Sequence, residues 1–185
     1  MESQLINEKE KISTAIMQAL KKAKINGREV LLSYSFQLEV GDILPFLTHP
    51  ADRDKTRIYW EQPTTNTAFA GIGSAYLIDQ DKAISLREIN RKISQLFSNA
   101  VCLPVDIGKS PRSIGGIAYD VHGAADKTWE KFPRGRWVLP ECMATRNERG
   151  TWLTISRLVN KDNSHINILD EFIQTCIHYQ NRLPV

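Results

Sequence analysis

Residues 29–40 read EVLLSYSFQLEV, and apolar and polar side chains alternate along most of this stretch. Successive side chains of a β-strand point to opposite faces, so a period of two separates the residues into two sets. The pattern predicts a long antiparallel strand with one face in a core and one face in water. The predicted core face consists of Val30, Leu32, Tyr34, Phe36, Leu38 and Val40, and most of the expected wet face consists of Glu29, Ser33, Ser35, Gln37 and Glu39.

A helix is predicted on the N-terminal side of this strand. Its apolar residues recur every three or four positions, as on one face of a helix, and Asn26 and Gly27 form a usual C-terminal cap. On the other side, Gly41 and Asp42 break the strand, and a short helical turn is expected over residues 44–47. The predicted inward stripe of the first helix is Ile12, Ile16, Leu20 and Ala23.

The rest of the chain alternates between strand and helix patterns. Residues 57–61 and 67–78 read as the two strands of a hairpin, separated by the turn-forming residues 62–66. A second helix begins at Ser85, because Ser85 and Glu88 fit a capping box. Further strands are predicted at 114–121, 136–144 and 151–158, with a hairpin turn at 147–150 and a closing helix from about residue 165. The expected buried stripes are Leu86, Ile89, Ile93, Leu96 and Phe97 in the second helix, and Leu169, Phe172, Ile173, Cys176 and Ile177 in the last.

This order of elements predicts an α+β fold with a mainly antiparallel β-sheet and helices packed outside. The chain has 185 residues, a length at which one hydrophobic core is usual, so residues 1–185 are expected to form a single domain. Hydrophobic residues make up 42% and charged residues 24% of the chain, close to ordinary globular usage, which argues against extensive disorder.

The charge and the cysteines exclude several classes of protein. With 24 basic and 21 acidic residues the chain is too balanced for a dedicated nucleic-acid-binding domain. The basic cluster within residues 21–28 is better explained as a solvated helix end than as a phosphate or membrane contact. Cys102, Cys142 and Cys176 are too far apart in sequence for a disulfide framework or a zinc site, so we expect free thiols.

No membrane segment is predicted. Residues 1–4 carry no apolar signal core, and no stretch has the eighteen or so apolar residues that a spanning helix needs. We therefore expect a cytoplasmic protein, or a stromal one if a transit peptide has been removed.

The glycine-rich motifs are incomplete as ligand sites. Gly71-Ile72-Gly73 resembles the start of a phosphate-binding loop, but Tyr76 stands where a third small residue is needed, and a strand rather than a helix follows. Gly115 and Gly116 are better explained by a bulge or by a close crossing of sheet backbones.

The titratable residues form no recognisable catalytic set. The four histidines lack the spacing of a helical metal site, and Asp120 and His122 have no nucleophile motif beside them. Glu61, Glu130 and Glu141 each neighbour an aromatic residue or a proline, which can raise a carboxyl pKa, although such residues are more often surface charges. The sequence therefore names no catalytic, cofactor-binding or metal-binding residue.

Five short phrases, read in order, carry a family resemblance. The phrases are RIYWE at 57–61, FAGIG at 69–73, GGIAYD at 115–120, WEKFP at 129–133 and WVLP at 137–140. Together they resemble the N-terminal region of isochorismate synthases, within the wider family of chorismate-utilising enzymes. In the third to fifth positions of GGIAYD, the sequence has IAY where FAF is commoner in that family, a change that keeps the apolar alternation.

The resemblance implies a fold and a chemistry beyond what the residue pattern gives. Such enzymes pack two related halves so that their β-sheets face each other with helices outside, and residues 1–185 would supply the N-terminal half. In the family a lysine activates water, a glutamate protonates the leaving hydroxyl, and further glutamates hold a magnesium ion. Those residues lie in the C-terminal half, so no position here inherits a catalytic role, and no cofactor is expected in this chain although magnesium is expected for the full-length enzyme.

The resemblance also implies a partner. We expect a catalytic C-terminal half of the same enzyme, in the same polypeptide or as a separate chain, and no nucleic acid or membrane. The alternative is a stand-alone binding or structural module that kept the fold. The sequence leaves open whether the enzyme makes isochorismate or salicylate.

Two expectations concern surfaces. Trp60 and Trp137 occupy alternating strand positions, so both are expected to be largely buried. The apolar face of residues 30–40 would lose part of its cover without a second half, which predicts self-association or one concave apolar face. The alternative is that the chain closes its own core with its three helices.

Overall fold

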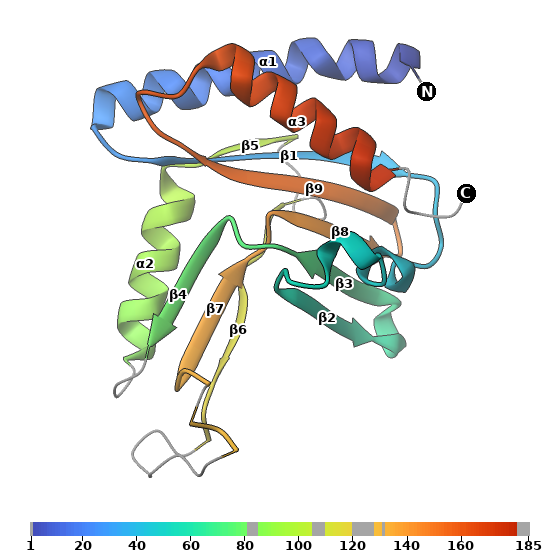
Figure 1. The fold of residues 1–185 in the computed structure, drawn as a ribbon, viewed down its shortest axis with the longest axis vertical. Helices are drawn as coiled ribbons and strands as arrows, with labels where there is room; N and C mark the ends of the chain where they lie inside the picture. Colours follow the sequence, from blue (N-terminus) through green and yellow to red (C-terminus); the bar gives the residue numbers. More distant parts are fainter. Residues whose placement is uncertain (1, 81–84, 105–109, 120–127, 131, 181–185) are drawn as a thin grey trace.

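The computed structural model describes residues 2–80, 85–104, 110–119, 128–130 and 132–180, whose strands form two β-sheets (Figure 1). The larger sheet has the strand order β2-β3-β8-β9-β1-β5, in which β1 and β5 are parallel and the other neighbours are antiparallel. The smaller sheet is antiparallel, with the order β4-β7-β6. The strands are β1 (Val30–Leu38), β2 (Arg57–Gln62), β3 (Thr67–Ile72), β4 (Tyr76–Gln80), β5 (Val101–Leu103), β6 (Ile114–Ile117), β7 (Gly135–Leu139), β8 (Cys142–Asn147) and β9 (Gly150–Val159).

Two long helices cover one face of the larger sheet. They are α1 (Glu2–Asn26) and α3 (His165–Gln180), whereas α2 (Leu86–Ser98) contacts β1 from the opposite side of that sheet (Figure 1). Three short 3₁₀ helices complete the described elements: η1 (Leu44–Leu47), η2 (Pro50–Asp52) and η3 (Pro63–Thr65). The α+β class with a mainly antiparallel sheet is therefore confirmed. No helix in the described residues is both long enough and apolar enough to cross a membrane.

The predicted core face of β1 is covered by the chain's own helices. Val30, Leu32 and Tyr34 are buried together with Ile16 of α1 and Phe172 of α3, while the far end of that face is half-buried. The expectation that this face loses its cover is therefore wrong, because α1 and α3 pack together across it. The alternative expectation, that the chain closes its core with its own helices, is confirmed for this face.

The other face of β1 is wet only in part: Gln37 is exposed as predicted, as are Glu29 and Glu39 beside the strand, whereas the two serines are buried. Ser33 and Ser35 are only 1% and 4% exposed. Their hydroxyl oxygens lie 2.9 Å from Ser156 Oγ and 2.8 Å from Thr154 Oγ1 on β9, so each hydroxyl has a partner across the strands. Short polar side chains that satisfy each other can be buried on an interior strand, and their sequence pattern does not distinguish that state from exposure.

Two strands that the sequence predicts as continuous are bent, and the bends join the two sheets. The stretch 67–78 divides into β3 and β4, and the stretch 136–144 divides into β7 and β8. Because β3 pairs with β8 and β4 pairs with β7, both strands of one ladder leave the larger sheet at the same place. The Ala75 N–H donates to the Leu139 carbonyl at 2.8 Å, which carries the ladder across the bend.

Glycines permit the bend. A Cβ at Gly71 would lie 2.6 Å from Pro140 Cγ, so the proline ring occupies the space that a side chain would need. Gly73 has φ +72°, a left-handed conformation, and a Cβ there would lie 2.6 Å from Glu141 Oε2. The two glycines within the predicted strand are therefore explained by close contact with the Pro140–Glu141 turn.

Most other predicted elements are found near their expected places. Gly27, with φ +62°, ends α1, and the Ser85 side chain accepts from the Glu88 N–H at the start of α2. The 57–61 hairpin and the 147–150 turn are present, and η1 matches the turn expected at 44–47. The strand expected at 114–121 is described as β6 only, since residues 120 and 121 lie outside the described residues.

Further differences from the sequence-based expectations concern β5 and the buried stripes of α2 and α3. The strand β5 was missed because three apolar residues at a sheet edge carry no periodic signal. On α3, Phe172 and Cys176 are buried as predicted, but Ile168 is buried in place of Leu169. On α2, Ile89 is the one residue of the predicted stripe that is fully buried, and Leu86 is exposed. The buried residues of α3 are Ile168, Phe172, Cys176 and Tyr179.

The prediction of a largely buried side chain is wrong for Trp60 and holds for Trp137. Trp60 is 45% exposed, because β2 is an edge strand, and its ring stacks on Phe69 at 5.4 Å on the face away from α1 and α3. Most of the Trp137 side chain in β7 is covered, and its ring occupies the space beside Gly115. The strand assignments hold for both residues, but a strand position alone does not ensure cover on both sides of a ring.

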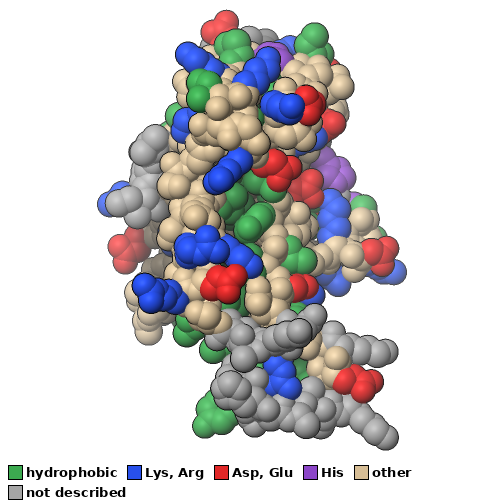
Figure 2. Space-filling model, turned by 90° about the vertical axis from the view of Figure 1, so that its left-hand side faces the viewer, with side chains coloured by type: hydrophobic (Ala, Val, Ile, Leu, Met, Phe, Trp, Pro, Cys, Tyr) green, Lys and Arg blue, Asp and Glu red, His purple; other side chains and the backbone are tan. Residues whose placement is uncertain are grey.

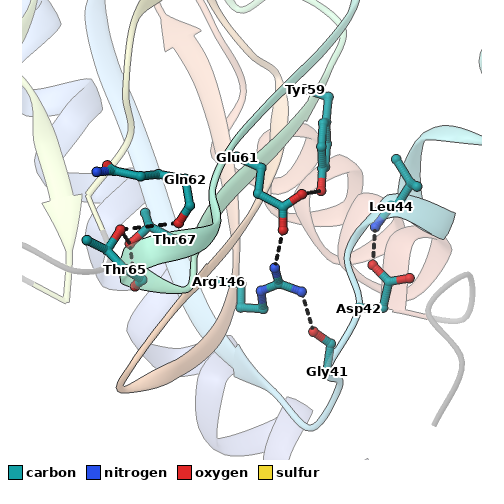
Figure 3. A network of polar contacts seen from close by, with 9 residues as sticks. All are labelled: Gly41, Asp42, Leu44, Tyr59, Glu61, Gln62, Thr65, Thr67 and Arg146. Atoms are coloured by element: carbon teal, nitrogen blue, oxygen red, sulfur yellow. Dashed lines mark hydrogen bonds and ion pairs between the residues drawn. The ribbon is translucent and has the colours of Figure 1, made fainter.

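A polar network closes the edge of the core beyond β2 (Figure 3). Arg146 of β8 donates to Glu61 Oε1 at 2.7 Å and to the Gly41 carbonyl at 3.2 Å, and the Tyr59 hydroxyl donates to Glu61 Oε2 at 3.0 Å. These bonds fasten the segment after β1 to the edge of the sheet. Glu61 is therefore an ion-pair partner of Arg146 in this structure.

Replacing Gly73 by alanine tests the bend. The left-handed conformation and the contact with Glu141 should together lower the free energy of unfolding by about 2–3 kcal/mol. Gly116→Ala is the matched control, because a Cβ at Gly116 meets nothing within 4 Å, and it should change stability by less than about 0.5 kcal/mol. Urea unfolding of both variants measures the difference, and equal effects would show that the bend does not depend on Gly73.

Two tryptophan substitutions test the assignment of exposed and buried faces. Trp60→Ala should cost about 1–2 kcal/mol, since much of the ring is already in water. Trp152, at 3% exposure, is the comparison, and Trp152→Ala should cost about 3–5 kcal/mol. A larger loss for Trp60→Ala than for Trp152→Ala in denaturant unfolding would contradict the described packing.

Candidate functional site

Four polar side chains from separate segments meet beside the bend. Asp52 ends η2 and is 1% exposed, and the Lys55 ammonium lies 3.5 Å from Asp52 Oδ1 and 3.6 Å from Glu141 Oε2. The Tyr179 hydroxyl of α3 lies 3.4 Å from both Lys55 Nζ and Asp52 Oδ1. One cation therefore links η2, the Pro140–Glu141 turn and the end of α3. We call Asp52, Lys55, Glu141 and Tyr179 the bend cluster.

The electrostatics of the bend cluster favour fixed protonation states. Burial lowers the pKa of Lys55, but the Glu141 carboxylate, Tyr179 and Asp52 together raise that pKa above its ordinary value. Burial raises the pKa of Tyr179 to about 12, so the phenol keeps its proton at neutral pH. A lysine held as ammonium and a phenol held neutral are poor general bases at neutral pH. The bend cluster is suited to holding segments together.

Sequence reasoning did not find the bend cluster. Asp52 and Lys55 belong to none of the sequence motifs, and Glu141 stands out in the sequence only as a carboxylate beside a proline. Tyr179 lies 124 residues from Lys55, and no local pattern connects them. Only the packing of α3 against the bend brings these groups together.

A cleft of about 560 Å³ opens next to the bend cluster. It lies where the bent strands diverge from β9, and α3 forms its other wall. Glu141 and Arg157 carry charge at its lining, and Arg157 forms an ion pair with Glu171 of α3. The lining of the cleft also includes Ser74, Ala75, Ser156, Leu158, Phe172 and Thr175.

The surface on the side shown in Figure 2 carries both signs of charge. Basic and acidic side chains are interspersed there, around a central hollow in which hydrophobic side chains are visible. A continuous basic surface, which nucleic-acid-binding domains present, is not seen on this face. In the basic cluster at the end of α1, Lys22 donates to the Ala100 carbonyl at 3.1 Å, a contact beyond the end of α2.

The glycine motifs and the cysteines have structural roles. Residues 71–73 form the end of β3 and the bend, and a Cβ at Gly115 would lie 2.2 Å from the Arg136 carbonyl oxygen of the neighbouring strand. The close crossing of backbones expected at Gly115 is therefore present. The three cysteines are free, as expected, and burial raises the pKa of each thiol, that of Cys176 to about 12. A buried thiol with a raised pKa is a poor nucleophile.

The remaining sequence candidates are the four histidines, Asp120 and Glu130. Asp120 and His122 lie outside the described residues, and Glu130 is on the exposed surface. His165 pairs with Ser13 at 3.0 Å, and the rings of His49 and His178 lie 6.2 Å apart. In the described part of the chain, no group of three or more His, Cys, Asp or Glu side chains is placed to hold a metal ion.

Lys55→Met tests the bend cluster. It removes the ammonium but keeps most of the aliphatic stem, which leaves the buried Asp52 carboxylate without its cation, so we expect a loss of about 2 kcal/mol in the free energy of unfolding. Lys92→Met is the matched control, because Lys92 pairs with Glu88 on the surface of α2 at 3.5 Å, and such a pair contributes under about 0.5 kcal/mol. Equal losses for the two variants in urea unfolding would contradict a stabilising role for Lys55.

The chain is similar to curated proteins and to a solved structure. The chain is 26% identical over 153 residues to the isochorismate synthase MenF of Bacillus subtilis, covering 78% of this chain and 32% of that protein. It is 29% identical over 115 residues to the salicylate biosynthesis isochorismate synthase of Pseudomonas aeruginosa, covering 62% of this chain and 23% of that protein. The structure of MenF, the menaquinone-specific isochorismate synthase of Escherichia coli, aligns with a TM-score of 0.43 and 14% identity, covering 92% of this chain and 34% of that one.

The chain thus spans about a third or less of the length of these relatives. A sequence model of one family, described as chorismate binding enzyme, matches residues 18–183. The match includes both sheets, the bend, all of α3 and the C-terminal part of α1. Since it covers most of the sequence, the chain belongs to the chorismate binding enzyme family.

Proposed function

We propose that this chain is the N-terminal portion of an isochorismate synthase, an isomerase that converts chorismate to isochorismate. The observation that supports the proposal is the similarity to the isochorismate synthases of Bacillus subtilis and Pseudomonas aeruginosa, within a family of chorismate binding enzymes. The name of the Pseudomonas aeruginosa relative points to salicylate as an end product, and the proposal also includes menaquinone. A phylloquinone pathway uses the same intermediate and is included in the proposal.

The proposed division of labour leaves the chemistry to another portion of the enzyme. In the described residues, Lys55 and Tyr179 are held protonated and no carboxylate cluster suits a magnesium ion. We therefore assign neither magnesium nor an acid–base pair to these residues. The proposed partner is a catalytic portion, in the same polypeptide or as a separate chain, which supplies both.

A second candidate function is a stand-alone binding or structural module. The observation that favours it is the closed core of the larger sheet, where α1 and α3 bury one face without help from another portion. Such a unit can be stable by itself, because its apolar face is already removed from water. Binding to a catalytic portion separates the two functions, because only the first predicts such a complex, whereas neither predicts turnover by this chain alone.

The purified 185 residues should not convert chorismate. Chorismate is incubated with the chain and magnesium, and its loss and the appearance of isochorismate are followed by liquid chromatography. The Bacillus subtilis enzyme under the same conditions is the positive control. Turnover by the purified chain, retained through a second purification step, would refute the proposed division of labour.

A further inference from the structure

The strand β9 is paired on both sides along most of its length but not at its end. On one side, β1 pairs with β9 from Thr151 to Val159. On the other side, the ladder with β8 ends at Ile155, after which the Ser156 N–H donates to the Glu141 carbonyl at 2.8 Å. Beyond Glu141, the neighbouring strand bends into the smaller sheet and leaves β9 (Figure 1).

The free edge is limited to Leu158. Backbone groups of alternate residues point to the same side of a strand, so the N–H and C=O of Leu158 point to the side of Ser156. The next N–H on that side, at Asn160, donates to Asn163 Oδ1 at 2.8 Å. In the described residues no strand lies beside Leu158 on this side, so its backbone donor and acceptor form a short open edge.

This open edge faces the cleft beside the bend. Leu158 and Ser156 line the cleft together with Phe172 and Thr175 of α3. The cleft volume of about 560 Å³ exceeds what one side chain fills. Neighbouring strands lie roughly 4.8 Å apart, and the place next to Leu158 is where β8 would have continued if it had not bent.

The charges around the cleft favour an uncharged occupant. Arg157 forms an ion pair with Glu171, and Glu141 lies 3.6 Å from the Lys55 ammonium. Because each charge already has a partner of opposite sign, the cleft offers little net attraction to a small ion. An extended backbone satisfies the open donor and acceptor without adding charge.

We propose that the cleft receives an extended segment of the catalytic portion of the enzyme, which adds a strand beside β9 at Leu158. This inference rests on the proposed function and specifies where the partner docks. This chain spans 32% of Bacillus subtilis MenF, so a larger portion of such an enzyme remains from which the added segment can come. Strand addition supplies affinity through main-chain hydrogen bonds and depends little on the identity of side chains.

Hydrogen exchange at the Leu158 amide tests the proposal. The probe is the part of Bacillus subtilis MenF that this chain does not match, produced as a separate polypeptide and added to the isotope-labelled 185-residue chain. We expect exchange of the Leu158 amide to slow by about tenfold or more in the complex. A complex in which this exchange is unchanged would overturn the strand addition and leave the proposed function standing. Failure to form any complex would overturn both.

Two substitutions at one position separate the backbone from the side chain. Leu158→Pro removes the N–H and suits an open strand edge, whereas Leu158→Ala keeps the N–H. We expect the proline variant to bind the same polypeptide about tenfold more weakly and the alanine variant less than about threefold more weakly. Equal weakening would point to a side-chain contact and overturn the strand addition. If the proline variant unfolds at a lower urea concentration, the exchange measurement alone decides.

Discussion

The close contact between two glycines and the Pro140–Glu141 turn is the constraint on which the structure depends. Gly71 and Gly73 leave space that the proline ring and the glutamate occupy, so a ladder of two strands can bend without a steric clash. The bend divides one set of strands into two sheets. It also separates β8 from the end of β9, and the cleft and the open edge at Leu158 are consequences of that separation.

The bend cluster connects this constraint to the helices. Lys55 lies between the buried Asp52, the Glu141 carboxylate at the bend and the Tyr179 hydroxyl near the end of α3. Without the Lys55 ammonium, the buried Asp52 carboxylate would lose this cation, which is costly in a low dielectric. The position of α3 over the larger sheet therefore depends on apolar packing and on one partly exposed cation.

The phrases that carry the family resemblance describe architecture more than chemistry. Residues 57–61 and 69–73 form the edge hairpin and the approach to the bend, and residues 137–140 form the return strand with its proline. Gly115 lies so close to β7 that a side chain would overlap the Arg136 carbonyl. Such residues are restricted by close backbone contacts, so packing is sufficient to explain these phrases where the structure describes them.

By itself the sequence determined the order and type of most elements, because the periods of two and 3.6 residues and the caps at Gly27 and Ser85 are local signals. Tertiary structure alone decided which faces are covered: Ser33 and Ser35 are buried through pairing with β9, whereas Trp60 is half in solvent on an edge strand. It also decided the bends at Gly73 and Pro140, the parallel strand β5 and the bend cluster. Each depends on contacts between residues far apart in the chain, and no local period records such contacts.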